Sequence, residues 1–309
     1  MSKIYECLVI GAGPSGIGAA IKLHQAGVEV AIIEMSTPGG KINIAPRVDN
    51  YPGQHEIAGP DLAVIFFERL MKEGVEFIGD EITSLTKDGD TFVLAGKSST
   101  YYAKTVYIAT GTVERKVGLP LEDELFGHGL SYCALCDGHF FKGQDVLVIG
   151  GGNAALKEAI HLAGLVKHLY VIHRRNEFRG SNKLVDELRA KDNVTIMTPY
   201  IPVEFIKEGD HLSGVKIQNK ETLEEQVLTV QGVFPLVGQN PNTTFINIDI
   251  KNEWGNIPVD KQMMTRVPGA FAGGDVLPRD IRQIYLAEHD GMVAAKSIME
   301  YLGKWKTLS

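Results

Sequence analysis

The sequence lacks long apolar runs, a positive charge balance and abundant cysteine. No apolar run among its 309 residues reaches the ~18 residues that a membrane-spanning helix needs. Its start, Met1-Ser2-Lys3-Ile4, has none of the apolar core of a signal peptide. A formal net charge of −7 argues against nucleic acid or an anionic membrane surface as a partner. We therefore expect a cytoplasmic protein that binds neither nucleic acid nor membrane.

Three cysteines, at positions 7, 133 and 136, are too few for a scaffold held by disulfides. Cys7 begins the apolar run that predicts the first strand, so we expect a small core residue. Cys133 and Cys136 form a CxxC pair. Residues three apart on a helical turn lie about 5–6 Å from one another, within the ~4.4–6.8 Å that separates the Cα atoms of a disulfide. The pair can thus open and close with little backbone movement, and Asp137 is the nearest group that could move the accompanying proton.

Glycine, in contrast, is abundant, with 34 residues, and two glycine-rich fingerprints carry the strongest signal. The first, Gly11-Ala12-Gly13-Pro14-Ser15-Gly16, follows a predicted strand at 7–10 and opens a predicted helix that ends near residue 27. The second, Gly150-Gly151-Gly152-Asn153-Ala154-Ala155, follows a predicted strand at 146–149 and opens a helix that runs toward residue 163. Strand, tight turn and helix are the context of a dinucleotide-binding motif. Its glycines let the backbone approach a pyrophosphate, which lies at the helix N-terminus.

The end of the next strand distinguishes the two sites. Glu34 lies 34−11 = 23 residues after the first glycine of its fingerprint, and His173 lies 173−150 = 23 residues after its counterpart. At the first site the acid can accept hydrogen bonds from both ribose hydroxyls, as in FAD or NAD. At the second site the acid is missing, and His173-Arg174-Arg175 with Arg179 offers cations to a 2′-phosphate. The sequence therefore predicts one flavin or NAD site and one NADP site.

The order of the segments predicts an α/β fold with two Rossmann-like nucleotide-binding domains, the second inserted into the first. After residue 242 only one strand, near 269–275, and one long helix, near 283–301, remain, which is too little for a third nucleotide domain. We therefore expect this tail to return to the first domain. The predicted domains are 1–114 with 243–309, which binds the flavin, and 115–242, which binds NADPH and carries the CxxC pair.

A zinc site is the alternative to a redox disulfide, because His128, Cys133, Cys136 and His139 have a usable spacing. Two buried structural cysteines are a second alternative. We favour the redox disulfide and predict no metal, because a disulfide explains why two nucleotide sites share a chain with the cysteines.

Over essentially its whole length the chain resembles the low-molecular-weight, bacterial-type thioredoxin reductases. The motifs that carry the resemblance are the two fingerprints, the stretches 49–53, 108–111, 133–138 and 271–275, His173-Arg174-Arg175 with Phe178-Arg179, and Arg282-Gln283. The resemblance implies a homodimer in which NADPH reduces FAD, FAD reduces the Cys133–Cys136 disulfide, and the dithiol reduces thioredoxin. Because nicotinamide and dithiol must both reach one flavin ring, we expect the NADPH domain to rotate between half-reactions.

The resemblance also assigns roles to individual residues. Cys136 faces the flavin, Cys133 attacks thioredoxin, Asp137 donates the proton, and Phe140 with His128 and His139 touches the partner. The implied FAD contacts are Gly11, Gly13, Pro14, Ser15, Gly16, Glu34, Gly40, Lys41, Asn50, Ala109, Thr110, Gly111, Gly274, Asp275 (on the ribityl chain), Arg282 and Gln283. The implied NADPH contacts are Gly150, Gly152, Asn153, Ala154, Ala155, His173, Arg174, Arg175 and Arg179.

Three departures from the family pattern fall near the expected flavin. Lys41 replaces a usual Gln, Ile44-Ala45-Pro46 replaces threonines, and Glu288-His289 replaces Ala-Gly. We expect them to affect the flavin's hydrogen bonding and potential rather than the reaction. The rival functions are an NADPH-dependent flavoprotein reductase or a dithiol oxidase for another acceptor, and a non-enzymatic redox sensor with zinc and nucleotide sites.

Overall fold

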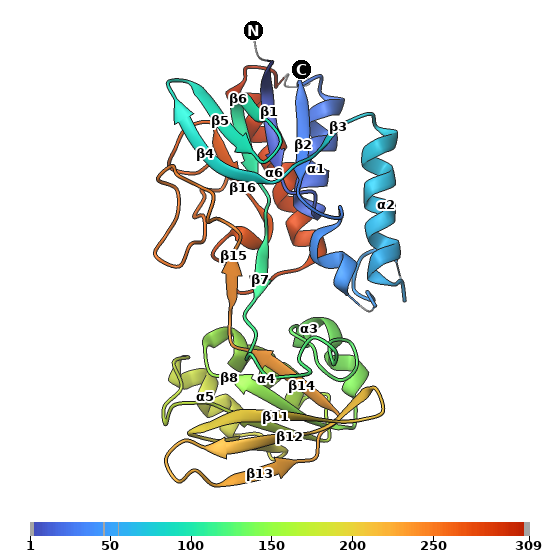
Figure 1. Cartoon of the computed structure of the whole chain (residues 1–309), viewed down its shortest axis with the longest axis vertical. Helices are drawn as coiled ribbons and strands as arrows, with labels where there is room; N and C mark the ends of the chain where they lie inside the picture. The colour runs from blue at the N-terminus through green and yellow to red at the C-terminus, as the bar shows by residue number, and fades with distance from the viewer. Residues whose placement is uncertain (1–2, 46, 55, 306–309) are drawn as a thin grey trace. The chain divides into compact units, whose positions relative to one another are not determined.

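The computed structural model describes residues 3–45, 47–54 and 56–305, and the chain divides into two compact units (Figure 1). Unit 1 consists of Met1–Val113 and Asn240–Ser309, and unit 2 of Glu114–Gln239. The chain passes between the units at β7 (Thr112–Glu114) and β15 (Gln239–Pro241), which pair with each other. Among the described helices, none combines the length and apolar character required to cross a bilayer.

Unit 1 is built on a sheet with the strand order β3-β2-β1-β6-β5-β4, in which β16 also pairs with β6. The parallel strands are β1 (Ile4–Ile10), β2 (Val30–Glu34), β3 (Glu76–Gly79), β6 (Thr100–Ile108) and β16 (Ala270–Ala272). An antiparallel hairpin, β4 (Ile82–Asp88) and β5 (Thr91–Gly96), continues the sheet. The helices are α1 (Pro14–Gln25), α2 (Gly59–Lys72) and α6 (Ile284–Tyr301), with short 3₁₀ turns η1 (Gly40–Ile44) and η3 (Gly274–Val276).

Side chains of β1 alternate between two cores, as the two-residue period of a strand requires. Cys7 and Val9 pack with α1, α2 and α6, whereas Leu8 and Ile10 pack with β4, β5 and the segment 246–277. β1 is therefore buried on both faces, which explains its continuous apolar sequence.

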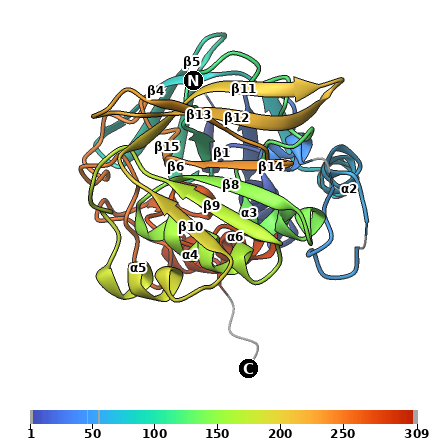
Figure 2. The same ribbon diagram turned by 90° about the horizontal axis from the view of Figure 1, so that it is seen from below.

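Unit 2 has three layers, which Figure 2 shows from below. Its central parallel sheet has the order β10-β9-β8-β14, from β8 (Asp145–Gly150), β9 (His168–Ile172), β10 (Val194–Met197) and β14 (Gly232–Leu236). On one face lie α4 (Asn153–Ala163) and α5 (Asn182–Arg189), which pack on Val146 and Val148. On the other lies an antiparallel sheet of β11 (Tyr200–Glu208), β12 (His211–Asn219) and β13 (Glu225–Leu228), which packs on Leu147 and Ile149. Two short turns, α3 (Ala134–Asp137) and η2 (Gly138–Phe141), precede β8.

Each unit thus contains a parallel strand, a glycine turn and a helix where the sequence predicts a fingerprint: β1 with α1, and β8 with α4. The predicted α/β fold with two Rossmann-like domains is confirmed. The assignment of one cofactor to each predicted domain stays a prediction.

Candidate nucleotide-binding sites and dithiol

The first fingerprint forms the turn between β1 and α1. Gly11 has φ +101°, and a Cβ there would lie 2.6 Å from the Ala109 carbonyl oxygen, so the position requires glycine. A Cβ on Gly16 would lie 1.9 Å from the Gly11 carbonyl oxygen, and its absence lets the helix start close to the strand. Pro14 occupies the first turn of α1, where its missing N–H is not needed. A Cβ on Gly13, in contrast, would meet no described atom within 4 Å. This open face before a helix N-terminus is the space that a pyrophosphate requires.

Glu34, at the end of β2, lies beside this turn. Its Oε2 accepts a hydrogen bond from the Ala12 N–H at 2.7 Å, and its Oε1 accepts one from the Ser36 N–H at 2.9 Å. Each oxygen of a carboxylate can accept a further hydrogen bond, so Glu34 can also bind ribose hydroxyls. Gly40 is close as well, since a Cβ on it would lie 3.4 Å from the Gly13 Cα. The donor and acceptor set therefore fits the adenosine half of FAD.

Further predicted flavin contacts from distant parts of the sequence pair with one another in unit 1. Lys41 Nζ donates to Thr112 Oγ1 at 2.7 Å and forms an ion pair with Asp275 Oδ2 at 3.7 Å. Asn50 Nδ2 donates to Gln283 Oε1 at 2.8 Å. Thr112 was not predicted from the sequence, and its partner Lys41 is one of the departures from the family pattern.

Two other predicted segments are anchored by the backbone. Arg282 Nε donates to the Asp275 carbonyl oxygen at 3.4 Å. Thr110 Oγ1 donates to the Asn242 carbonyl oxygen at 2.7 Å, and the Asn242 N–H donates to the Gly111 carbonyl oxygen at 3.0 Å. The turn that follows β6 is thus held by the segment that follows β15.

Ser15 and Gly274, both predicted flavin contacts, belong to a buried polar network. The sequence did not indicate its other members, Tyr107, Arg279 and Asp290. Ser15 Oγ and Tyr107 OH are hydrogen-bonded at 2.6 Å, and a Cβ on Gly274 would lie 3.1 Å from the Ser15 Cβ. Asp290 Oδ2 accepts from the Gly274 N–H at 2.8 Å and from Arg279 Nη2 at 2.5 Å. Burial raises the pKa of Asp290, and the Gly274 hydrogen bond and the Arg279 charge oppose that rise. An acid on the buried face of an amphipathic helix is the signal that could have indicated Asp290.

The second fingerprint forms the turn between β8 and α4. A Cβ on Gly150 would lie 2.5 Å from the Leu236 carbonyl oxygen and 2.8 Å from the Ala155 Cβ, so helix and strand approach closely here. A Cβ on Gly151 would lie 2.4 Å from Nδ1 of His173. A Cβ on Gly152 would meet no described atom within 4 Å. As in unit 1, the open glycine directly precedes the helix N-terminus.

His173 lies at this turn with three arginines around it. Its side chain is 6% exposed, and its ring stacks on Phe178 with centroids 5.3 Å apart. Burial lowers the pKa of His173, and the charges of Arg179, Arg175 and Arg174 lower it further. Its buried Nε2 has no hydrogen-bond partner among the described residues. A buried ring nitrogen without a partner, beside exposed guanidinium groups, fits a site for an anionic group such as a 2′-phosphate.

The loop that carries Arg179 folds back onto the fingerprint. The N–H groups of Arg179 and Gly180 both donate to the Gly151 carbonyl oxygen, at 2.9 and 3.0 Å. The Ser181 N–H donates to Asn153 Oδ1 at 2.8 Å. The 23-residue offset read from the sequence therefore does bring the predicted NADPH contacts together.

Cys133 and Cys136 are joined as a disulfide, with Cα atoms 5.3 Å apart. Cys133 is the N-cap of α3, and its Sγ accepts a hydrogen bond from the Cys136 N–H at 3.2 Å. Both cysteines are partly buried, whereas Leu135, His139 and Phe140 are exposed beside them. Ser131 and Glu158, which the sequence did not indicate, also contact this turn. The disulfide-forming geometry expected from the spacing is confirmed.

The zinc alternative is not favoured. The ring of His139 packs on Phe140 with centroids 4.0 Å apart, and that of His128 packs edge-on against His211 at 5.3 Å. Within residues 3–45, 47–54 and 56–305, no group of three or more His, Cys, Asp or Glu side chains is placed to hold a metal ion.

Cys7 is a free, buried cysteine in β1. Burial raises the pKa of its thiol to about 12, and a smaller effect of a hydrogen bond with Thr105 opposes the rise. The prediction of a small core residue is confirmed, and the raised pKa disfavours the thiolate, which is the reactive form of cysteine.

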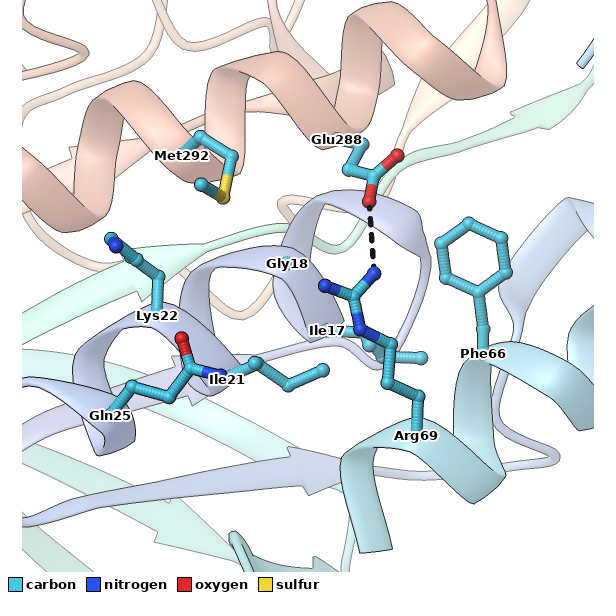
Figure 3. Close-up of a pocket in the computed structure, with 9 residues that line it drawn as sticks. All are labelled: Ile17, Gly18, Ile21, Lys22, Gln25, Phe66, Arg69, Glu288 and Met292. Carbon is cyan, nitrogen blue, oxygen red and sulfur yellow. Dashed lines mark ion pairs between the residues drawn. The ribbon is translucent and has the colours of Figure 1, made fainter. Parts of the chain in front are cut away.

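Of the other departures, Glu288 lies at a cavity of about 80 Å³ in unit 1, between α1, α2 and α6 (Figure 3). Glu288 lines it, pairs with Arg69 Nη1 at 3.7 Å and accepts a hydrogen bond from Tyr51 OH at 2.9 Å. Burial raises the pKa of Tyr51 to about 12, and the hydrogen bond to Glu288 is the next largest cause of this rise. His289 and Ile44 are exposed, and Pro46 lies outside the described residues. Glu288 therefore ties α6 to α2 and to the loop around Tyr51.

Comparison with known proteins identifies the family. The protein-family model described as "Pyridine nucleotide-disulphide oxidoreductase" matches residues 5–291 of the chain. Because the match covers most of the sequence, the chain belongs to that family.

The similar proteins within the family are more specific. A thioredoxin reductase from Listeria monocytogenes is 37% identical over 307 residues, 98% of this chain and 96% of the relative. One from Mycoplasma pneumoniae is 38% identical over 302 residues, 97% of this chain and 96% of the relative. The crystal structure of thioredoxin reductase from Streptococcus pyogenes has 38% identity and a TM-score of 0.92, covering 99% of this chain and 100% of that one. The chain therefore belongs with the bacterial-type thioredoxin reductases, as its motifs predict.

Proposed function

We propose that the chain is a thioredoxin-disulfide reductase that uses FAD and NADPH. The observation that carries the proposal is the partly exposed Cys133–Cys136 disulfide in the same unit as the fingerprint flanked by His173. A flavoprotein that passes electrons from its flavin directly to ferredoxin or to oxygen has no use for this disulfide. A dithiol oxidase that needs no NADPH has no use for the arginines around His173.

Unit 1 supplies the flavin site in this proposal. When bound, FAD supplies two-electron transfer between the nicotinamide of NADPH and a disulfide. The open face of Gly13 and the N-terminus of α1 receive its pyrophosphate, and Glu34 accepts hydrogen bonds from the adenosine ribose. The paired side chains Lys41 with Asp275 and Asn50 with Gln283 hold the flavin half.

Unit 2 supplies the NADPH site. The open face of Gly152 lets the backbone of the turn approach the pyrophosphate, and the N-terminus of α4 favours its negative charge. Arg174, Arg175 and Arg179 bind the 2′-phosphate beside His173, whose buried Nε2 has no hydrogen-bond partner among the described residues.

The dithiol carries the electrons to the protein substrate. Two electrons and two protons open the Cys133–Cys136 bond and give two thiols. Cys133 then attacks the disulfide of thioredoxin, and Cys136 resolves the mixed disulfide, so that the S–S bond re-forms in this chain and two thiols are left in thioredoxin. Asp137, next to Cys136 in α3, supplies one of the two protons.

We also propose that unit 2 rotates on β7 and β15 between the half-reactions. These short strands are the two passages of the chain between the units, which suits a hinge. A cross-link that fixes unit 2 should block either flavin reduction by NADPH or reduction of thioredoxin, and spare the other. The hinge is wrong if a locked protein performs both steps at the rates of the unlinked one.

The partner, the assembly and the location complete the proposal: a thioredoxin-like substrate, a homodimer and the cytoplasm. Analytical ultracentrifugation of the FAD-loaded protein tests the assembly, and a monomer at micromolar concentration would contradict it.

The test of function is turnover of NADPH by the FAD-loaded protein with oxidised thioredoxin, compared with oxygen and ferredoxin as acceptors. We expect thioredoxin to be the fast acceptor and NADPH to be preferred over NADH. If NADPH were consumed as fast with oxygen alone as with thioredoxin, and no thiols formed in thioredoxin, the result would favour the rival flavoprotein reductase.

A further inference from the structure

Ser131 occupies a buried position two residues before Cys133, and no pattern in the sequence indicates a role for it. The residue is only 4% exposed to solvent. Its N–H donates to the Val233 carbonyl oxygen of β14 at 3.1 Å, which fixes the serine to the central sheet of unit 2. The backbone that carries the hydroxyl group is therefore anchored to the central sheet.

The hydroxyl connects two groups of the dithiol turn. Ser131 Oγ donates to Asp137 Oδ2 at 2.6 Å and accepts a hydrogen bond from the Cys133 N–H at 3.1 Å. A distance of 2.6 Å lies in the range of ~2.5–2.7 Å for a hydroxyl that donates to an ionised carboxylate. One oxygen atom thus joins the acid of the reaction to the backbone of the attacking cysteine.

We propose that Ser131 is the positioning residue for Asp137: its hydroxyl holds the carboxyl group in register with Cys133 in both protonation states of the acid. The proposal rests on the proposed function, in which Asp137 moves protons for the dithiol.

The chemistry of the disulfide explains why both states need a partner. The disulfide needs two electrons and two protons to become two thiols. The hydride of NADPH accounts for both electrons and one proton, which pass by way of the flavin, and Asp137 supplies the second proton. Loss of that proton leaves a carboxylate, and reprotonation restores the acid for the next turnover. A hydroxyl can donate to a carboxylate and, after rotation about its C–O bond, accept from a carboxylic acid. The oxygen of Ser131 stays in place while only its hydrogen moves.

If Ser131 had only a structural role, its replacement would not change how dithiol formation depends on pH. A second residue that contacts the same turn, Glu158, provides a control. Glu158 on α4 accepts a hydrogen bond from the Ala134 N–H at 2.7 Å, so it also satisfies an amide of this turn, from the other side of the CxxC sequence. Glu158→Gln keeps an acceptor oxygen for that amide. We expect this variant to keep the wild-type dependence of dithiol formation on pH.

Ser131→Ala is the test. In stopped flow, reduction of bound FAD by NADPH should keep its wild-type rate, which also shows that the variant folds. Transfer to the disulfide, measured as new thiols in quenched samples, should slow about 10- to 100-fold, a part of the ~10²–10⁴-fold that general acid–base catalysis contributes. With thioredoxin, kcat should fall by this factor while KM stays the same, and the pH profile of the transfer step should shift.

Ser131→Thr and Ser131→Val form a second pair, because the two side chains have nearly the same shape and differ in the hydroxyl. Thr should restore the rate and the pH profile, and Val should not. Equal behaviour of Thr and Val, or a wild-type profile in Ser131→Ala, would overturn the proposal. A wild-type protein that forms thiols on itself but never in thioredoxin would instead refute the proposed function and leave the Ser131 comparison valid for the internal step.

Discussion

Replacement of Gly152 by alanine should separate nucleotide binding from folding in unit 2. A Cβ at Gly152 would meet no described atom within 4 Å, and the backbone has φ −90° and ψ 173°, which alanine adopts without strain. Gly→Ala at such a position stabilises a fold by ~0.4–1 kcal/mol, because it restricts the unfolded chain. The variant should therefore melt at the same temperature as the wild type or slightly above it.

Binding of NADPH should change in the opposite direction. The added methyl group occupies the face on which the backbone of the turn approaches the pyrophosphate. An extra methyl in a well-packed site costs about 1–3 kcal/mol, and 1.4 kcal/mol corresponds to a tenfold change in affinity. The Kd for NADPH should therefore rise about 5- to 150-fold.

Isothermal titration with NADP⁺ and thermal unfolding of the FAD-loaded protein give the two quantities. Gly151→Ala is the matched control, since its Cβ would lie 2.4 Å from the buried ring of His173 and should lower the melting temperature. Gly13→Ala is the counterpart in unit 1, where a Cβ also meets open space, and it should lower retention of FAD while NADP⁺ binding stays normal. An unchanged Kd for NADP⁺ in Gly152→Ala would refute the placement of the pyrophosphate.

Three other predictions concern the path of electrons from NADPH through the flavin and the disulfide to thioredoxin. The double variant Arg174→Ala with Arg175→Ala should raise the Kd for NADPH at least about tenfold, since hydrogen bonds to charged groups contribute ~1.5–3 kcal/mol. It should leave the Kd for NADH unchanged, and an equal rise in both Kd values would exclude a 2′-phosphate contact. Cys136→Ser should keep the reduction of the flavin by NADPH and abolish the reduction of thioredoxin. Cys133→Ser should also abolish the reduction of thioredoxin. Normal turnover with thioredoxin in either variant would indicate a direct route from the flavin to the acceptor. The pKa of His173 lies below its ordinary 6.5 in the free protein, chiefly through burial. Because a nearby phosphate favours the protonated ring, NADP⁺ affinity should increase as the pH falls toward that lowered pKa. Titrations at several pH values check this, with NAD⁺ as control, and a flat profile for both nucleotides would contradict it.

The parts of the site that depend on local chain geometry were predictable from the sequence. The fingerprints, the 23-residue offset to Glu34 and His173, and the CxxC spacing each follow from a strand, a turn or one helical turn, and the structure forms all of them. Cys7 was predictable for the same reason, since an apolar strand determines its burial.

Contacts between distant segments were not predictable. Ser15 and Tyr107 are 92 positions apart, and Lys41 and Thr112 are 71 apart, so only the completed sheet of unit 1 brings them together. Ser131 is near Cys133 in sequence, but its role depends on the hydrogen bond of its hydroxyl to Asp137, made from a backbone that is anchored on β14. A serine before a CxxC pair has no sequence pattern that distinguishes this contact from an ordinary turn.

The most direct test of the electron route is the number of thiols formed when one equivalent of NADPH is added to the FAD-loaded protein without oxygen. The account predicts two new thiols per chain, at Cys133 and Cys136, together with a flavin that returns to its oxidised absorption once the electrons have passed on. Cys7 stays buried and does not change the count. A flavin that remains bleached while no new thiol appears would contradict the account, because the electrons would then stop before the disulfide.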